Sequence, residues 1–170
     1  VSSWKWSTSE NLMPGAKLID QEGRTVHKWK PDRGSLFGSS ARGGDPKRAD
    51  FHGAHLFPNG DLLLLLSYIG LVRLDACGNV KWTQTEGNHH SISRADDGSF
   101  WVPGVSAVRR TKTEAHNDGF PGLTTEVPKF QNPSVWMDRL LHVSPDGKVL
   151  NDINVLDVLY ENNLQRYVRK

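Results

Sequence analysis

The segment HGAHLFPNGDLLLLL (residues 52–66) decides the fold of this chain, because it joins a turn signal to an uninterrupted apolar run. Asn59-Gly60 is a strong signal for a tight hairpin, since glycine supplies the positive φ that such turns require. The five leucines that follow are typical of a buried strand. The segment HSISRADDGSFWV (residues 90–102) has the same layout around an Asp-Gly pair. Both segments are therefore predicted to form β-hairpins.

Hairpins of a second kind alternate with these two. Each is an apolar strand, a turn that ends in glycine and another strand, and they occupy residues 17–29, 71–82 and 140–151. The turn glycines Gly60 and Gly98 are 38 residues apart. That spacing is close to the repeat of about 40–50 residues in four-stranded propeller blades. The pattern predicts an all-β fold made of propeller blades.

One domain of this kind would span residues 1–170. Its blade pieces are expected at about residues 15–30, 51–83 and 88–151. Segments rich in Gly, Ser or Pro are expected to be loops, at residues 30–50 and 105–136. An apolar pattern near the end of the sequence predicts a short C-terminal helix at about residues 153–167.

The sum is a partial propeller of about two and a half four-stranded blades. A propeller hides its strand edges only when the ring closes, and an open arc leaves edges unpaired. We therefore expect missing sequence or a second chain to complete the ring. A small open sheet or sandwich that folds alone is the alternative.

Composition argues against several classes of protein. The net charge is +2 and the basic residues are scattered, which does not favour a nucleic-acid partner. Cys77 is the single cysteine, so no disulfide, redox pair or thiolate metal cage forms within the chain. No apolar run reaches the length of a membrane span. Composition does not distinguish a cytosolic from a periplasmic protein.

Two histidines occupy matched positions in the repeat. When the hairpins of the first kind are aligned on their turn glycines, His52 falls on His90, each eight residues before the glycine. In a propeller the innermost strands line the central channel, so both imidazoles are expected at its mouth as catalytic residues. Imidazole serves proton transfer, nucleophilic group transfer and metal binding because its pKa lies near neutrality. A purely structural role at a strand end is the alternative.

Three more residues are candidates for substrate binding. His89 directly precedes His90, and His55 lies three residues after His52, on the opposite face of a regular strand unless a bulge re-aims it. Arg110 is a candidate for bidentate binding of an anionic group, with a surface position as the alternative. The histidine spacing matches no compact zinc motif, so we expect neither a metal nor a cofactor.

The ordered set GAHLFPNGDLLLL (53–65), GLVRLDACGNVKW (70–82), HHSISRADDGSFWV (89–102) and DRLLHVSPDGKVLNDINVLDVL (138–159) resembles the arylsulfotransferase (ASST-type) family. The resemblance covers most of residues 15–159. It implies a six-bladed propeller, located in the periplasm or outside the cell, of which this chain is an N-terminal portion.

The resemblance also implies a reaction. Members of the family move a sulfuryl group from a phenol sulfate to another phenol through a transiently sulfated channel histidine. His52 and His90 would match sulfate-binding or acid/base histidines, whereas the covalent histidine belongs to a later blade that this sequence lacks. A non-catalytic propeller module that binds a protein or ligand in a larger assembly is the rival hypothesis. A hydrolase or lyase on the same scaffold is a third.

Overall fold

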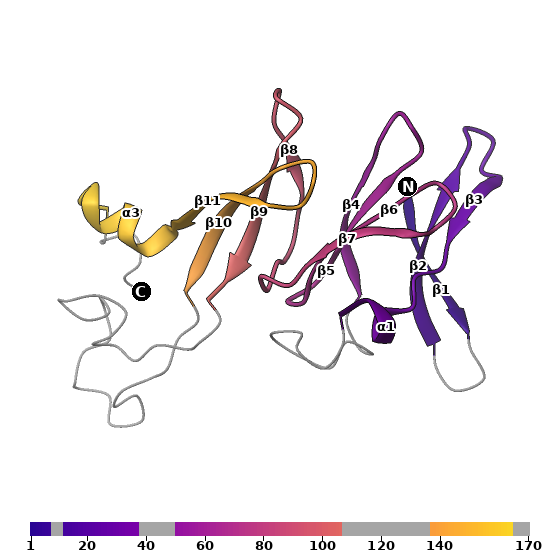
Figure 1. Cartoon of the computed structure of the whole chain (residues 1–170), viewed down its shortest axis with the longest axis horizontal. Helices are drawn as coiled ribbons and strands as arrows, with labels where there is room; N and C mark the ends of the chain where they lie inside the picture. Colours follow the sequence, from indigo (N-terminus) through magenta and orange to yellow (C-terminus); the bar gives the residue numbers. More distant parts are fainter. Residues whose placement is uncertain (8–11, 38–49, 107–136, 165–170) are drawn as a thin grey trace.

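The computed structural model describes residues 1–7, 12–37, 50–106 and 137–164, and this part of the chain is mostly β-structure. Three antiparallel sheets follow one another along the chain, and in each sheet the strands pair in sequence order (Figure 1). The prediction of an all-β chain is confirmed.

The strands of the three sheets have the following bounds. The first sheet contains β1 (Ser2–Ser7), β2 (Leu12–Ile19) and β3 (Thr25–Trp29). The second contains β4 (Phe51–Leu56), β5 (Leu62–Leu66), β6 (Gly70–Leu74) and β7 (Val80–Gln84). The third contains β8 (Ser93–Arg94), β9 (Phe100–Val105), β10 (Asp138–Val143) and β11 (Val149–Asn154). Two short helices are described, α1 (Arg33–Phe37) and α3 (Val155–Glu161).

The same turn closes five of the hairpins. In each, the glycine donates its backbone N–H to the carbonyl three residues earlier, and that earlier residue donates to the carbonyl just after the glycine. This is the pattern of a tight turn that ends in a left-handed residue, where glycine avoids the strain of a Cβ atom. The predicted positive φ is confirmed at Gly23, Gly60, Gly78, Gly98 and Gly147.

Strand β5 lies between two cores, because all five of its leucines are buried. Leu62, Leu64 and Leu66 pack with side chains of the first sheet, including Trp29. The alternate residues Leu63 and Leu65 pack with Phe100 and Leu141 of the third sheet, among others. Complete burial of each leucine contributes about 1.5–3 kcal/mol to folding. The second sheet is therefore the middle layer of the described structure.

Tryptophan side chains make hydrogen bonds between successive sheets. The indole N–H of Trp29 on β3 donates to the carbonyl of Asp75, in the β6–β7 turn, at 3.2 Å. The indole N–H of Trp82 on β7 donates to the carbonyl of Pro145, in the β10–β11 turn, at 3.1 Å. Arg73 on β6 donates to the same Pro145 carbonyl at 2.8 Å. Successive sheets thus use the same contact, from the last strand of one to the last turn of the next.

The buried carboxylate of Asp61 supports the contact between the second sheet and the β10–β11 turn. Asp61 is 3% exposed and accepts hydrogen bonds from Arg73 at 2.7 Å and Lys81 at 2.9 Å. Burial by itself raises the pKa of Asp61, but the hydrogen bonds from Lys81 and Arg73 hold that pKa below its usual value. The ionised Asp61 keeps the Arg73 guanidinium in place over the Phe57 ring, 3.9 Å from its centroid.

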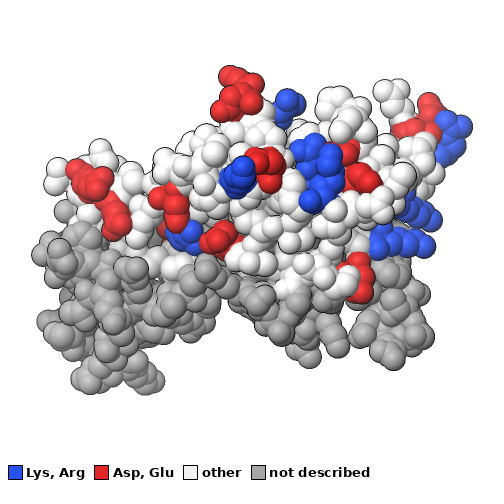
Figure 2. Space-filling view, in the orientation of Figure 1, with Lys and Arg blue, Asp and Glu red and all other residues white. Residues whose placement is uncertain are grey.

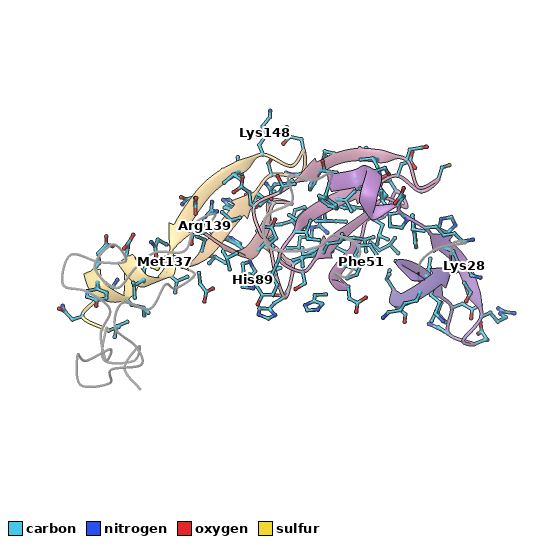
Figure 3. All side chains as sticks on the ribbon, turned by 90° about the horizontal axis from the view of Figure 1, so that it is seen from below. Lys28, Phe51, His89, Met137, Arg139 and Lys148 are labelled. Atoms are coloured by element: carbon cyan, nitrogen blue, oxygen red, sulfur yellow. The ribbon has the colours of Figure 1, made fainter. Side chains whose placement is uncertain are left out.

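The sheets follow a curve with a distinct inner and outer side. Figure 3 shows Phe51, at the start of β4, and His89, shortly before β8, on the inner side, with Lys148 on the opposite side. Strands β1, β4 and β8 form one edge of their sheets, and strands β3, β7 and β11 form the other.

The structure corrects several predicted boundaries. Residues 2–7 form β1, which pairs with β2, although no strand was expected there. The predicted loop at 30–50 contains helix α1, and its residues 38–49 lie outside the described part of the chain. Most of the predicted loop at 105–136 also lies outside it. Strand β8 pairs over two residues only, and the segment from His90 to Ile92 is irregular.

The C-terminal helix is shorter than predicted. Asn154 caps it by accepting a hydrogen bond from the Leu156 N–H. The helix ends at Glu161 rather than near residue 167, because Asn163 adopts a left-handed conformation with φ 56°. Such a residue interrupts the helical hydrogen-bond pattern.

We predict that Gly147→Ala destabilises the protein more than Gly78→Ala. Both glycines have positive φ, so alanine adds strain of about 1–2 kcal/mol at either position. A Cβ atom at Gly147 would lie 2.6 Å from the Trp82 ring, whereas one at Gly78 meets nothing within 4 Å. Displacing Trp82 adds about 1–3 kcal/mol. Urea unfolding measures the difference, and equal losses of unfolding free energy in the two variants would contradict the role of Trp82.

Candidate functional site

His52 lies in a β-bulge of β4, an edge strand of the second sheet. Phe51 pairs with Leu66 and Gly53 pairs with Leu65, so His52 is the extra residue of β4. A bulge of this kind redirects a side chain without ending the strand. The His52 side chain is exposed. A Cβ atom at Gly53 would lie 3.3 Å from Ile92, so the glycine lets the second sheet approach the segment that leads into β8.

His90 is held in an unusual backbone conformation. Its φ is 64°, in the left-handed region that residues other than glycine rarely adopt. The preceding residues are fixed to β9, because His89 donates its N–H to the Pro103 carbonyl at 3.0 Å and Asn88 pairs with Gly104. Strain of this kind costs about 1–3 kcal/mol and persists where the surroundings enforce it.

The structure brings His52 and His90 together. Their ring centroids lie 6.3 Å apart and the ring planes differ by 22°. One ring comes from the first strand of the second sheet, and the other from the segment just before the first strand of the third. The matched repeat positions therefore correspond to neighbouring side chains.

Tyr68 joins this pair and was not anticipated from the sequence. It lies in the β5–β6 turn, and its φ of 60° is also left-handed. Its N–H donates to the Asn88 carbonyl at 2.7 Å. The Tyr68 ring lies 5.2 Å from the His89 ring and 6.5 Å from the His90 ring. We call His52, Tyr68, His89 and His90 the histidine cluster.

His89 is the buried member of the histidine cluster, 6% exposed. Its ring meets the His90 ring edge-on at 4.6 Å, and its Nε2 lies 3.8 Å from the Asp138 carboxylate. Burial lowers the pKa of His89 and the neighbouring His90 lowers it further, against opposing effects of Asp138 and the Gly104 carbonyl. Neither ring nitrogen has a well-formed hydrogen bond to the described residues. The His90 ring therefore packs edge-on against a buried imidazole whose neutral form is favoured.

The segment before His89 is anchored from the third sheet. Arg139 on β10 contacts Glu86 at 3.2 Å and also binds Asp152 on β11. Asn88 is fully buried, and its side-chain amide has no hydrogen-bond partner among the described residues. A buried, unsatisfied amide costs about 1–3 kcal/mol, so stability alone does not explain Asn88.

A cavity of about 260 Å³ opens beside His52, between the first two sheets. Strands β1, β2 and β4 supply most of its wall. Its lining residues are Val1, Ser2, Gly15, Ala16, Phe51, His52, Gly53, Ala54 and Leu64. His52 therefore borders the cavity and also faces His90. This cavity was not anticipated from the sequence, because β1 was not predicted.

The other predicted site residues are not brought to the cluster. His55 packs between the second and third sheets, with ring centroids 4.8 Å from Phe57 and 5.4 Å from Phe100. Burial lowers the pKa of His55, and Arg94 and Arg73 lower it further. We assign His55 a packing role. Arg110 lies outside the described residues.

The contact between His142 and Ser99 is a structural one rather than part of a catalytic triad. The Nε2 atom of His142 lies 2.6 Å from the Ser99 hydroxyl, and its ring stacks on Trp101 at 4.4 Å. The Asp97 carboxylate binds the hydroxyl of Ser99 rather than the His142 ring. This order differs from a catalytic triad, in which the carboxylate orients the histidine.

Figure 2 shows acidic and basic side chains interspersed over one face of the described residues. Within the described ranges, no group of three or more His, Cys, Asp or Glu side chains is arranged to hold a metal ion. No helix in the described residues is long and apolar enough to span a bilayer.

Comparison with solved structures finds a distant neighbour. No family model and no curated protein matches the sequence. A crystal structure of a protein of unknown function from Bacteroides caccae is similar with a TM-score of 0.32 and 13% identity. The match covers 86% of this chain and 57% of that one, so the chain spans less than two thirds of that protein.

We predict that unfolding free energy falls as the pH drops below about 6.5. The pKa values of His55 and His89 are lowered in the folded state, so the unfolded chain binds protons first. The stability that the neutral forms of these two histidines contribute is complete above the pKa of histidine in the unfolded chain. It is lost as the pH falls through the pKa values of the two histidines in the folded protein. His55→Gln and His89→Gln should each reduce this pH dependence, and the double variant should reduce it most.

Urea unfolding between pH 5 and 7.5 measures this dependence. Lys148→Gln is the control, because it changes an exposed side chain in the β10–β11 turn, away from both histidines. An unchanged dependence in the double variant would show that other groups cause it.

Proposed function

We propose that the three sheets are successive blades of a β-propeller and that the histidine cluster lies at its central channel. Three features support the proposal: the sheets are consecutive meanders, they follow a curve, and their first strands are edge strands. A ring of six blades, as the family resemblance implies, would place these edges around the channel. Further sequence or a second chain would then supply the remaining blades.

We propose that the cluster takes part in sulfuryl transfer from an aryl sulfate to a phenol. The observation that carries the proposal is the near-parallel pair of His52 and His90, from successive sheets, at 6.3 Å. Two imidazoles at this separation can direct N–H groups at the oxygens of one tetrahedral anion. Donors arranged in advance in this way stabilise the charge that develops on those oxygens during transfer.

The reaction proceeds in two displacements. A nucleophilic histidine from a later blade attacks sulfur, the S–O bond to the aryl group breaks, and the leaving phenolate takes a proton from His52 or His90. The acceptor phenol then attacks sulfur, loses its proton to the same imidazole, and breaks the S–N bond. Exchange of a proton by a positioned imidazole contributes about 10²–10⁴-fold to such a step.

Other members of the site have supporting roles in this proposal. His89 and Tyr68 hold the His90 ring, and Arg110 would add a cationic donor to the sulfuryl oxygens. By the family resemblance, such a protein works in the periplasm or outside the cell.

We predict that His52→Ala and His90→Ala each lower sulfate transfer at least about 100-fold, because each removes a positioned donor. The assay follows release of 4-nitrophenol from 4-nitrophenyl sulfate with phenol as acceptor, using protein expressed from its complete reading frame. His27→Ala is the matched control, since His27 lies on β3 against Trp29 and outside the cluster.

Two results would count against the proposal. Absence of turnover by the unmodified protein would remove the transferase function and leave a non-catalytic binding module. Unchanged rates in both cluster variants would return His52 and His90 to structural roles.

We also predict that the native particle exceeds the 19.0 kDa of this chain. The physical reason is that an open arc exposes the strand edges that a closed ring hides. Native mass spectrometry together with denaturing electrophoresis distinguishes one longer polypeptide from an assembly of short ones. A stable, monodisperse particle of 19.0 kDa would show that the sheets stand alone, against the propeller.

A further inference from the structure

We propose that anion binding at the histidine cluster is coupled to protonation of His89: the buried ring takes up a proton from solvent when an oxyanion binds between His52 and His90, and returns it when the anion leaves. His89 is then a positioning residue, because it acts on the anion through the His90 ring. The inference rests on the anion site of the proposed function, and it adds how the protein balances the charge of the bound anion.

His89 lies behind the two rings that would meet the anion. It is 6% exposed, whereas His52 and His90 are exposed. Its ring centroid lies 4.6 Å from that of His90, so a charge at His90 acts on His89 over a short distance. The backbone N–H of His89 donates to the Pro103 carbonyl at 3.0 Å, which holds the residue against β9. The buried ring therefore senses the charge of the exposed pair without touching the ligand.

Two acceptors near the His89 ring favour its protonated form. The Asp138 carboxylate lies 3.8 Å from Nε2, and the Gly104 carbonyl acts on the ring as a second acceptor. A neutral imidazole carries one N–H, whereas an imidazolium carries two and can donate from both nitrogens. Neither ring nitrogen makes a well-formed hydrogen bond to the described residues in the anion-free protein. The site is thus built to accept a second proton on this ring.

Two other effects oppose that proton when no anion is bound. Burial lowers the pKa of His89, and the neighbouring His90 lowers it further. The Tyr68 ring, 5.2 Å away, covers His89 without adding a charge. An anion between His52 and His90 brings a negative charge to the side from which His90 acts, and a nearby opposite charge favours the imidazolium. Anion binding and proton uptake therefore favour each other.

Isothermal titration with sodium sulfate tests the coupling on the protein from its complete reading frame. Repeating the titration in buffers with different enthalpies of ionisation gives the number of protons taken up with the anion. Between pH 5.5 and 7.5 the unmodified protein should take up at least about 0.3 proton more than His89→Gln, since one linked group exchanges at most one proton. Sulfate affinity should rise toward acid pH, and it should rise less steeply in the variant.

Asp138→Asn is a second variant, and it leaves the imidazole in place. The Asp138 side chain is 69% exposed, so the substitution does not disturb the core. It removes a charge that raises the pKa of His89, so the maximum of proton uptake should move to lower pH. Asp96→Asn is the matched control. It removes an exposed carboxylate in the β8–β9 turn, at the opposite end of β9 from Gly104, and should leave the uptake unchanged.

Two-bond ¹H–¹⁵N spectra of the histidine rings give a direct measurement in the unmodified protein. With His89 assigned through its own backbone, sulfate should move its ring nitrogen shifts toward those of imidazolium near pH 6.5, the ordinary pKa of histidine. The proposal is overturned if sulfate binds and these shifts do not change, or if folded His89→Gln takes up as many protons as the unmodified protein.

The same measurements separate this proposal from the transferase. Absence of sulfate binding would overturn both the coupling and the anion site of the proposed function. Proton uptake at His89 without sulfate transfer would uphold the coupling and reject the transferase. Sulfate transfer together with an unresponsive His89 would do the reverse.

Discussion

The structure depends on one constraint, which is that the five leucines of β5 are buried on both faces of their sheet. A strand alternates its side chains between two faces, so a run of apolar residues needs a cover on each side. Leu62, Leu64 and Leu66 obtain theirs from the first sheet, and Leu63 and Leu65 from the third. This order of sheets brings the starts of neighbouring first strands together. His52 and His90 meet as a consequence of how the leucines are covered.

The same hydrogen bonds, repeated between successive sheets, determine how the sheets pack against one another. Trp29 and Trp82 make corresponding hydrogen bonds to the last turn of the following sheet. The Asp61–Arg73 pair reinforces the second contact from within the sheet. The turns themselves are alike, since each ends in a left-handed glycine. A chain can thus extend the same arrangement by repeating a short pattern of residues.

The sequence predicts those parts of the structure that local chemistry controls. Asn59-Gly60, the leucine run and the shared offset of His52 and His90 from their glycines all depend on neighbours in the chain. The bulge at His52 and the left-handed conformation of Tyr68 depend on contacts between distant segments, such as the Tyr68 bond to Asn88. The cavity could not be inferred, because it requires β1 opposite β4. The end of α3 was missed because its apolar pattern continues past the point where the backbone leaves the helix.

The two left-handed residues of the cluster have a consequence for the evolution of this fold. Tyr68 and His90 each carry strain of about 1–3 kcal/mol, on opposite sides of one contact. Glycine at either position would relieve that strain but remove a ring from the site. The rings of the cluster are thus retained at the expense of backbone strain at two positions. The buried leucines of β5 contribute stability that offsets this strain.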